Sequence, residues 1–187
     1  MQLYMFAIMP LAGLEQRISE ERKAFAERYN CVKALKPPVH ITLYEPFKED
    51  PAIEQKLQGL APWVAQQAPV SIELNDFNYF NNRKSPVVYI DVVKNERLRE
   101  LRKGFVQQLR KYIPVAPQEQ EYRPHFTIGY RDVPPGLMPQ IIADHSMRRF
   151  KGSFVADKIY LWRHDGANWQ ILHEFPMLGI NAAPTLF

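Results

Sequence analysis

Cysteine is almost absent from this sequence, because Cys31 is the only one among 187 residues. A single thiol forms no internal disulfide and no thiolate cluster for zinc, which excludes a disulfide-stapled secreted domain and a cysteine-based zinc site. The sequence therefore favours a reducing, cytoplasmic environment. Cys31 itself is either a buried structural thiol, the more common case, or a reactive one.

Long hydrophobic runs and a strong charge imbalance are also lacking. The apolar segment over residues 1–9 carries no basic n-region and is too short to span a bilayer, so we interpret it as a first strand and expect no membrane association. The net charge is only +4, from 24 basic and 20 acidic residues. Such a modest excess tolerates an anionic ligand, whereas a dedicated duplex-binding protein usually shows a stronger basic stripe.

Apolar periodicity and turn residues predict alternating strands and helices. The first helix follows residue 10, and its charged residues, Arg22 among them, are interpreted as a solvated face. Further helices are predicted to begin near residues 50, 95 and 137, and strands lie at about 39–45, 70–80, 87–93, 124–131, 152–163 and 168–177. The order predicts an α+β fold, with two related lobes in one domain over residues 1–187, each a mainly antiparallel sheet backed by helices.

One short motif occurs twice, at corresponding places in the two halves. Residues 40–43 read His40-Ile41-Thr42-Leu43, and residues 125–128 read His125-Phe126-Thr127-Ile128. With five histidines and three threonines in the chain, random placement gives only about 0.08 His-x-Thr pairs. The repetition therefore indicates a function.

Strand geometry explains the spacing of this motif. Residues two apart point to the same face of a strand, so His40 and Thr42 share a face, and Tyr44 is predicted to share it too. The same alternation places Arg131 on the face of His125 and Thr127. Tyr44 is a candidate contact to a base or sugar. Arg131 is either a phosphate contact or a surface charge.

Two histidines facing one ligand suit phosphodiester chemistry. A neutral imidazole takes a proton from the attacking oxygen, while a protonated one gives a proton to the leaving oxygen. Threonine hydroxyls donate hydrogen bonds to the phosphate oxygens that gain charge in the transition state. Neither motif contains a carboxylate or a second histidine at ligand spacing, so we expect no metal and no other cofactor.

The two motifs resemble those of the two-histidine phosphoesterase superfamily, also called the 2′-5′ RNA ligase-like family, and the resemblance spans most of the chain. It implies a bilobal fold of two pseudo-symmetric sheets with helices on the outer faces and a central cleft. It also implies an RNA cyclic phosphodiesterase or ligase-like enzyme, acting on 2′,3′-cyclic phosphates or 2′-5′ linkages of RNA or nucleotides. His40 and His125 are then the catalytic pair, and Thr42 and Thr127 bind the phosphate.

The family's usual assignment makes the second-motif histidine the base toward water and the first the acid, which transfers to His125 and His40. The segment Tyr44-Glu45-Pro46-Phe47 departs from the Phe-Leu-Gly that follows the first motif in bacterial RNA cyclic phosphodiesterases. This departure suggests a divergent branch and leaves the substrate open.

A catalytically idle nucleotide- or RNA-binding module that uses the same cleft is the alternative function. Either function has an RNA end or a nucleotide as its partner, and no obligate protein partner is evident. His145, His164 and His173 have no matched motif and are interpreted as structural or surface residues. Phe80 belongs to an aromatic strand that either stacks on bases or, more commonly, forms part of the core.

Overall fold

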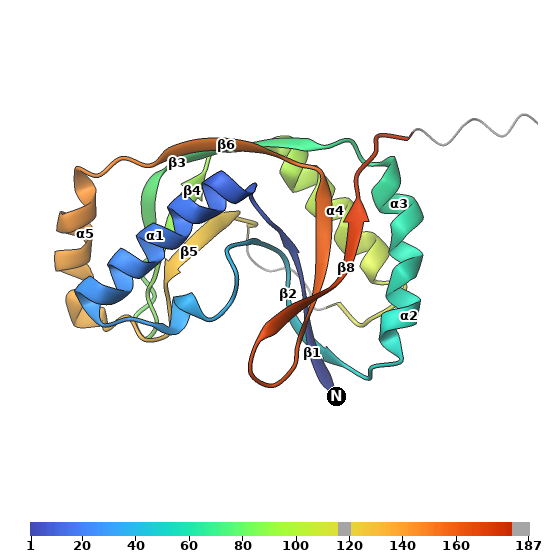
Figure 1. Cartoon of the computed structure of the whole chain (residues 1–187), viewed down its shortest axis with the longest axis horizontal. Coiled ribbons are helices and arrows are strands. Elements are labelled where there is room, and N and C mark those ends of the chain that lie inside the picture. The colour runs from blue at the N-terminus through green and yellow to red at the C-terminus, as the bar shows by residue number, and fades with distance from the viewer. Residues whose placement is uncertain (116–120, 181–187) are drawn as a thin grey trace, which may run out of the picture.

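The computed structural model describes residues 1–115 and 121–180, which form strands and helices in the order that Figure 1 shows. The strands are β1 (Gln2–Ile8), β2 (Ile41–Glu49), β3 (Val70–Phe80), β4 (Val87–Val92), β5 (His125–Gly129), β6 (Lys151–Ala156), β7 (Lys158–His164) and β8 (Trp169–Pro176). The helices are α1 (Ala12–Tyr29), α2 (Ile53–Leu57), α3 (Ala61–Gln66), α4 (Glu96–Leu109) and α5 (Met138–Ser146), with single 3-10 turns at η1 (Lys33–Leu35), η2 (Gln58–Leu60) and η3 (Pro135–Leu137).

The strands form two antiparallel sheets. Sheet A has the order β2-β1-β7-β8, and sheet B has the order β5-β4-β3-β6. Each motif strand, β2 or β5, is one of the two edge strands of its sheet. It pairs with the strand that begins its own unit, β1-α1-β2 or β4-α4-β5. The predicted α+β fold with two related antiparallel sheets is confirmed.

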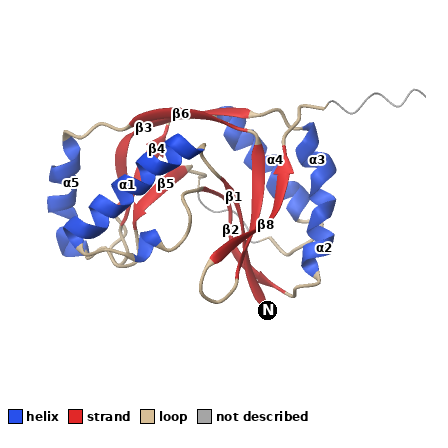
Figure 2. Ribbon diagram, viewed as in Figure 1, coloured by secondary structure: helices blue, strands red, loops and turns tan. Residues whose placement is uncertain are grey.

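The two long helices, α1 and α4, hold the two sheets together. Each packs on the sheet that does not contain the strands directly before and after it in the sequence. Helix α1 follows β1 but lies against β5, where a Cβ at Gly129 would overlap the Phe25 ring. Helix α4 follows β4 but packs on β1, with the Phe105 and Phe6 rings 4.8 Å apart. Figure 2 shows α1 and α5 on one side of the molecule and α2, α3 and α4 on the other.

The predicted strand over 152–163 is wrong in one respect, since it is two strands in different sheets. Asp157 alone separates β6, which pairs with β3, from β7, which pairs with β1. No glycine or proline marks this crossing point, so the run reads as one strand. Sheet A therefore combines the two ends of the described chain, whereas sheet B is built from its middle.

The two faces of β1 contribute to different apolar clusters. Tyr4, Phe6 and Ile8 belong to the main core beneath α4, whereas Met5 and Ala7 point to the opposite face. There they pack with Trp162 of β7, which is fully buried. The first motif packs against this second cluster, since His40 contacts Trp162 and Thr42 pairs with Ala7.

The start of α4 is fixed by a side-chain cap. The Asn95 side chain accepts a hydrogen bond from Leu98 N at 3.0 Å and donates one to Ser71 O at 2.6 Å. We expect Asn95→Ala to lower the free energy of unfolding by about 1 kcal/mol, as for other lost helix caps. Urea denaturation measures the change. Asn82→Ala, in the exposed loop after β3, is the control, and an equal loss there contradicts the cap.

Candidate active site

The two motif histidines are held in the same way at the start of their strands. His40 immediately precedes β2, and its Nδ1 donates to the carbonyl of Pro38 at 2.8 Å. His125 begins β5, and its Nδ1 donates to the carbonyl of Arg123 at 2.7 Å. A carbonyl oxygen only accepts, so each neutral imidazole carries its proton on Nδ1 and presents an unprotonated Nε2. Neither Nε2 has a hydrogen-bond partner among the described residues.

The fold brings the two motifs together. Strands β2 and β5 are in contact, although they belong to different sheets. The imidazoles are close enough that the charge of His125 contributes to lowering the pKa of His40. The Tyr122 hydroxyl, three residues before the second motif histidine, donates to the carbonyl of Thr42 at 3.1 Å. The sequence did not predict this link, because it joins residues 80 positions apart.

The two motif threonines occupy equivalent places. Thr42 pairs with Ala7 of β1, and Thr127 pairs with Tyr89 of β4. Both side chains are half-buried, and neither hydroxyl has a hydrogen-bond partner in residues 1–115 and 121–180. Each hydroxyl is therefore free to donate to a ligand between the motif strands.

The prediction that Tyr44 shares a face with His40 and Thr42 is wrong. Ala7 pairs with Thr42 but Phe6 pairs with Tyr44, so the pairing skips Leu43. This β-bulge reverses the alternation of side chains after the threonine. Leu43 and Tyr44 both enter the main core, and Tyr44 is only 7 % exposed and packs against Phe47.

The predicted place of Arg131 is wrong for the same reason. Tyr89 pairs with Thr127 but Val88 pairs with Gly129, so the second motif strand also bulges directly after its threonine. Strand β5 then ends at Gly129, and Arg131 has the left-handed φ of 65°. Arg131 is exposed, with its guanidinium over the Tyr130 ring. The paired bulges are a further element of the pseudo-symmetry.

Aromatic side chains flank both imidazoles. The Trp162 ring meets His40 edge-on, with centroids 5.0 Å apart and an angle of 65° between the planes. On the other side the rings of Tyr89 and Phe80 lie 4.7 Å and 5.3 Å from His125. Of these, the sequence singled out Phe80, as a base-stacking or core residue, and it packs beside a motif histidine. Tyr89 shows no such signal in the sequence, because its contact with His125 depends on strand pairing.

The environments of the two imidazoles differ. Burial is the main cause that lowers the pKa of His40 to about 4, and the charges of Arg22 and His125 lower it further, against the hydrogen bond to Pro38. Burial also lowers the pKa of His125, but there the Arg123 carbonyl and the Asp91 carboxylate both oppose the shift. His40 thus has cations as neighbours, whereas His125 has a carboxylate.

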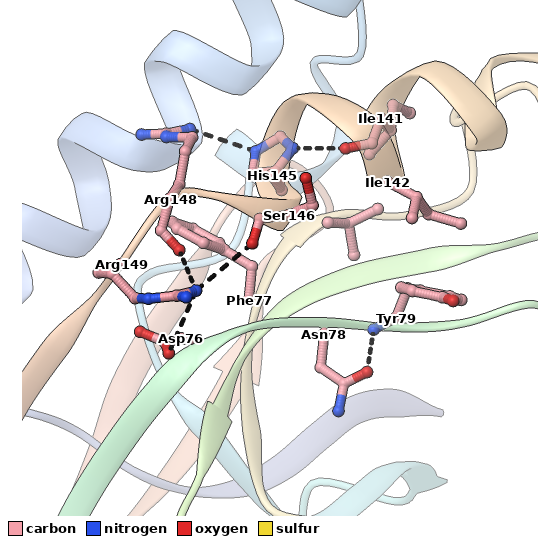
Figure 3. A pocket seen from close by; sticks show the side chains of 11 residues that line it. Asp76, Phe77, Asn78, Tyr79, Ile141, Ile142, His145, Ser146, Arg148 and Arg149 are labelled. Carbon is pink, nitrogen blue, oxygen red and sulfur yellow. Dashed lines mark hydrogen bonds and ion pairs between the residues drawn. The ribbon is translucent and has the colours of Figure 1, made fainter.

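His145 illustrates what a structural histidine looks like in this protein. It lines a hollow between β3, β4 and α5 (Figure 3), together with Phe77, Ile141 and Arg148. Its Nδ1 donates to the carbonyl of Ile141 at 2.8 Å, and its Nε2 lies 3.2 Å from Arg148 Nη1. Both ring nitrogens are engaged, unlike those of the motif histidines. The hollow is on the face of sheet B opposite to Tyr89, because its lining residue Val88 is the neighbour of Tyr89 in β4.

Three further features concern expectations drawn from the composition: the single cysteine, a metal site and a membrane-spanning helix. Cys31 is buried, and burial raises the pKa of its thiol, as expected of a structural cysteine. Within residues 1–115 and 121–180, no three His, Cys, Asp or Glu side chains gather closely enough to hold a metal ion. None of the helices in that part of the chain has the length and apolar character needed to cross a membrane.

Solved structures with low sequence identity share the fold. The protein TT0787 of Thermus thermophilus is 19% identical, covers 97% of this chain and all of its own, and superposes with a TM-score of 0.68. LigT of E. coli, solved with 3′-AMP, is 18% identical. The match covers 94% of this chain and 98% of LigT, with a TM-score of 0.69. Usb1 of Kluyveromyces marxianus is more distant, with 14% identity over 94% of this chain and 98% of its own and a TM-score of 0.52.

The sequence itself identifies the family. No curated protein matches it closely enough to count as a relative. The family model of the 2′-5′ RNA ligase superfamily, however, matches residues 10–168, a segment that contains both motifs and most of the chain. The protein therefore belongs to the 2′-5′ RNA ligase superfamily.

Proposed function

We propose that this protein is a metal-independent phosphoesterase that acts on 2′,3′-cyclic phosphates or 2′-5′ linkages of RNA or nucleotides. The observation that carries the proposal is the matched pair of hydrogen bonds from Nδ1 of His40 and His125 to backbone carbonyls. These bonds leave both Nε2 atoms available for proton transfer, beside two threonine hydroxyls that have no hydrogen-bond partner in the described part of the chain.

In hydrolysis, the oxygen of a water molecule bonds to phosphorus while one imidazole Nε2 takes its proton. The bond from phosphorus to the leaving sugar oxygen breaks, and the other imidazole, protonated at the start, gives that oxygen a proton. Thr42 and Thr127 donate to the non-bridging oxygens, where negative charge grows in the transition state. Histidine is suited to both roles because its ordinary pKa lies near neutral pH.

The substrate class has support from relatives of the same superfamily. E. coli LigT has been solved with 3′-AMP, NADP⁺, phosphate and ATP, all of which carry a phosphate group. Of the aromatic rings beside the motif histidines, Trp162 and Tyr89 are buried, whereas Phe80 is half-buried and has surface left on which a base attached to the phosphate can stack.

Hydrolysis of a nucleoside 2′,3′-cyclic phosphate tests the proposal. We expect turnover to be the same in buffer with excess EDTA as without it, because two imidazoles and two hydroxyls supply the proton transfer and charge stabilisation. Product formation is followed by chromatography. Loss of activity in EDTA contradicts the metal-free mechanism. Tight nucleotide binding without turnover of any cyclic phosphate or 2′-5′ linked substrate favours the idle binding module instead.

A further inference from the structure

Arg22 is a charged residue in the buried stripe of α1. Arg22 is only 5 % exposed, and the stripe comprises Leu14, Ile18, Arg22, Phe25, Ala26 and Tyr29. The expectation that Arg22 belongs to a solvated face is therefore wrong. Arginine is almost never fully buried unless it is paired, because removing its charge from water is costly. Its burial thus calls for a specific reason.

The contacts of Arg22 lead to the first motif. Its Nη2 donates to the carbonyl of Pro37 at 2.8 Å. The carbonyl of the next residue, Pro38, is the one that holds Nδ1 of His40. Guanidinium and imidazole are therefore anchored on adjacent carbonyls of one short segment. The Nε atom of Arg22 is buried, and it has no hydrogen-bond partner among the described residues.

The charge of Arg22 acts on His40. Burial lowers the pKa of Arg22 to about 10, so the guanidinium stays charged at neutral pH. The Glu15 carboxylate is a group whose charge favours that cation at neutral pH. The charged groups that act on His40 are Arg22 and His125, and both disfavour its protonation.

His125 has the opposite kind of neighbour. Asp91 is its partner across strands β4 and β5, and the Asp91 carboxylate favours a protonated imidazole. That carboxylate is in turn fixed by a hydrogen bond of 3.0 Å from Asn78 Nδ2. The two halves of a pseudo-symmetric site thus differ in the sign of the charge beside the histidine.

We propose that Arg22 is a positioning residue that holds the segment before His40 and adds to the effect of burial in keeping its imidazole neutral, so that His40 is the base and His125, beside Asp91, is the acid. This rests on the function proposed above. His40 Nε2 takes the proton of the water whose oxygen bonds to phosphorus, and His125 gives a proton to the sugar oxygen as its bond to phosphorus breaks. Exchange with solvent then restores both imidazoles. These roles are the reverse of those that the family resemblance implies.

NMR titration of the two imidazoles in the full-length protein tests this proposal without any substrate. We expect His125 to gain its second proton at a higher pH than His40 in the wild type. In Arg22→Met the midpoint of His40 should rise by about one pH unit, the size of shift that a close charge produces. Lys23→Met removes an equal charge from the exposed face of α1 and should leave His40 unchanged.

Two results overturn the proposal. One is a wild type in which His40 gains its proton at the higher pH, and the other is an equal shift of His40 in Arg22→Met and Lys23→Met. If Arg22→Met does not fold, Arg22→Lys is used instead. It retains the charge, so His40 should still gain its second proton at a low pH. Asp91→Asn should lower the titration midpoint of His125. An unchanged His125 in Asp91→Asn also overturns the assignment.

The activity assay separates this proposal from the function on which it rests. If the titration order is as expected and no cyclic phosphate is hydrolysed, the proposed function fails while the placement of charge stands. If the wild type hydrolyses the substrate but the titration order is reversed, the function stands and the roles assigned to His40 and His125 fail.

Discussion

Replacing either motif histidine by alanine is expected to lower kcat/KM for a nucleoside 2′,3′-cyclic phosphate by about 10²- to 10⁴-fold, the usual contribution of a general acid or base. Each substitution removes an Nε2 that the Nδ1 hydrogen bond keeps available, at His40 or at His125. The double variant should lose little more than the more damaged single variant, because residues that act in one step are not additive. Steady-state kinetics on the purified variants measures these losses.

His173→Ala is the matched control. His173 is half-buried on β8, two residues before Phe175, which packs in the main core on the face of sheet A opposite to Trp162. Its loss should leave kcat/KM within about twofold of the wild type, because its contacts are with Phe175 and Gln58 and not with either motif histidine. Activity that survives both His40→Ala and His125→Ala would refute the acid–base pair.

Replacing a motif threonine by valine is expected to lower kcat by about 10²- to 10³-fold, as the loss of one oxyanion donor does in other enzymes. Valine keeps the β-branched shape that suits a strand and removes only the hydroxyl of Thr42 or Thr127. KM should change far less than kcat, because the hydroxyl is expected to donate most strongly when charge has developed on phosphate.

The control for the threonines is Ser153→Ala, which removes an exposed hydroxyl from β6. It should leave kcat and KM unchanged. A rise in KM with kcat intact in the threonine variants would mean that Thr42 and Thr127 bind the substrate without stabilising the transition state, contrary to the role proposed for them.

The paired motif was predictable because it depends on local periodicity alone. Alternation of side chains places the histidine and threonine of each motif on one face and the apolar residues on the other, and Phe126 and Ile128 do enter the core. The start of a helix near residue 95 is also a local feature, and the structure has it with Asn95 as the cap. The fold class followed from the same kind of pattern.

The predicted alternation of side chains between the two faces of a strand is wrong where the strand pairing is irregular. The bulges after Thr42 and Thr127 remove Tyr44 and Arg131 from the faces predicted for them. Gly129 is a residue type that often marks a bulge in a strand, whereas the segment from Thr42 to Tyr44 carries no such signal. A register shift depends on the partner strand as well as on the strand itself. The position of such a shift is therefore not fixed by the sequence of one strand alone.

Long-range packing was the other missing element. Trp162 touches His40, and Tyr89 touches His125, only because the sheets bring distant segments together. Arg22 had a signal in the sequence, since it stands four residues after Ile18 and thus on the apolar stripe of α1. Its charge nevertheless favoured a place in solvent, and the hydrogen bond to the carbonyl of Pro37, which depends on the fold, accounts for its burial.

The most direct test of a shared phosphate site is a crystal structure of the protein with inorganic phosphate bound. We predict one phosphate that accepts hydrogen bonds from the hydroxyls of Thr42 and Thr127 and lies within hydrogen-bond distance of Nε2 of both His40 and His125. Phosphate bound elsewhere, or held by only one of the two motifs, would contradict the account.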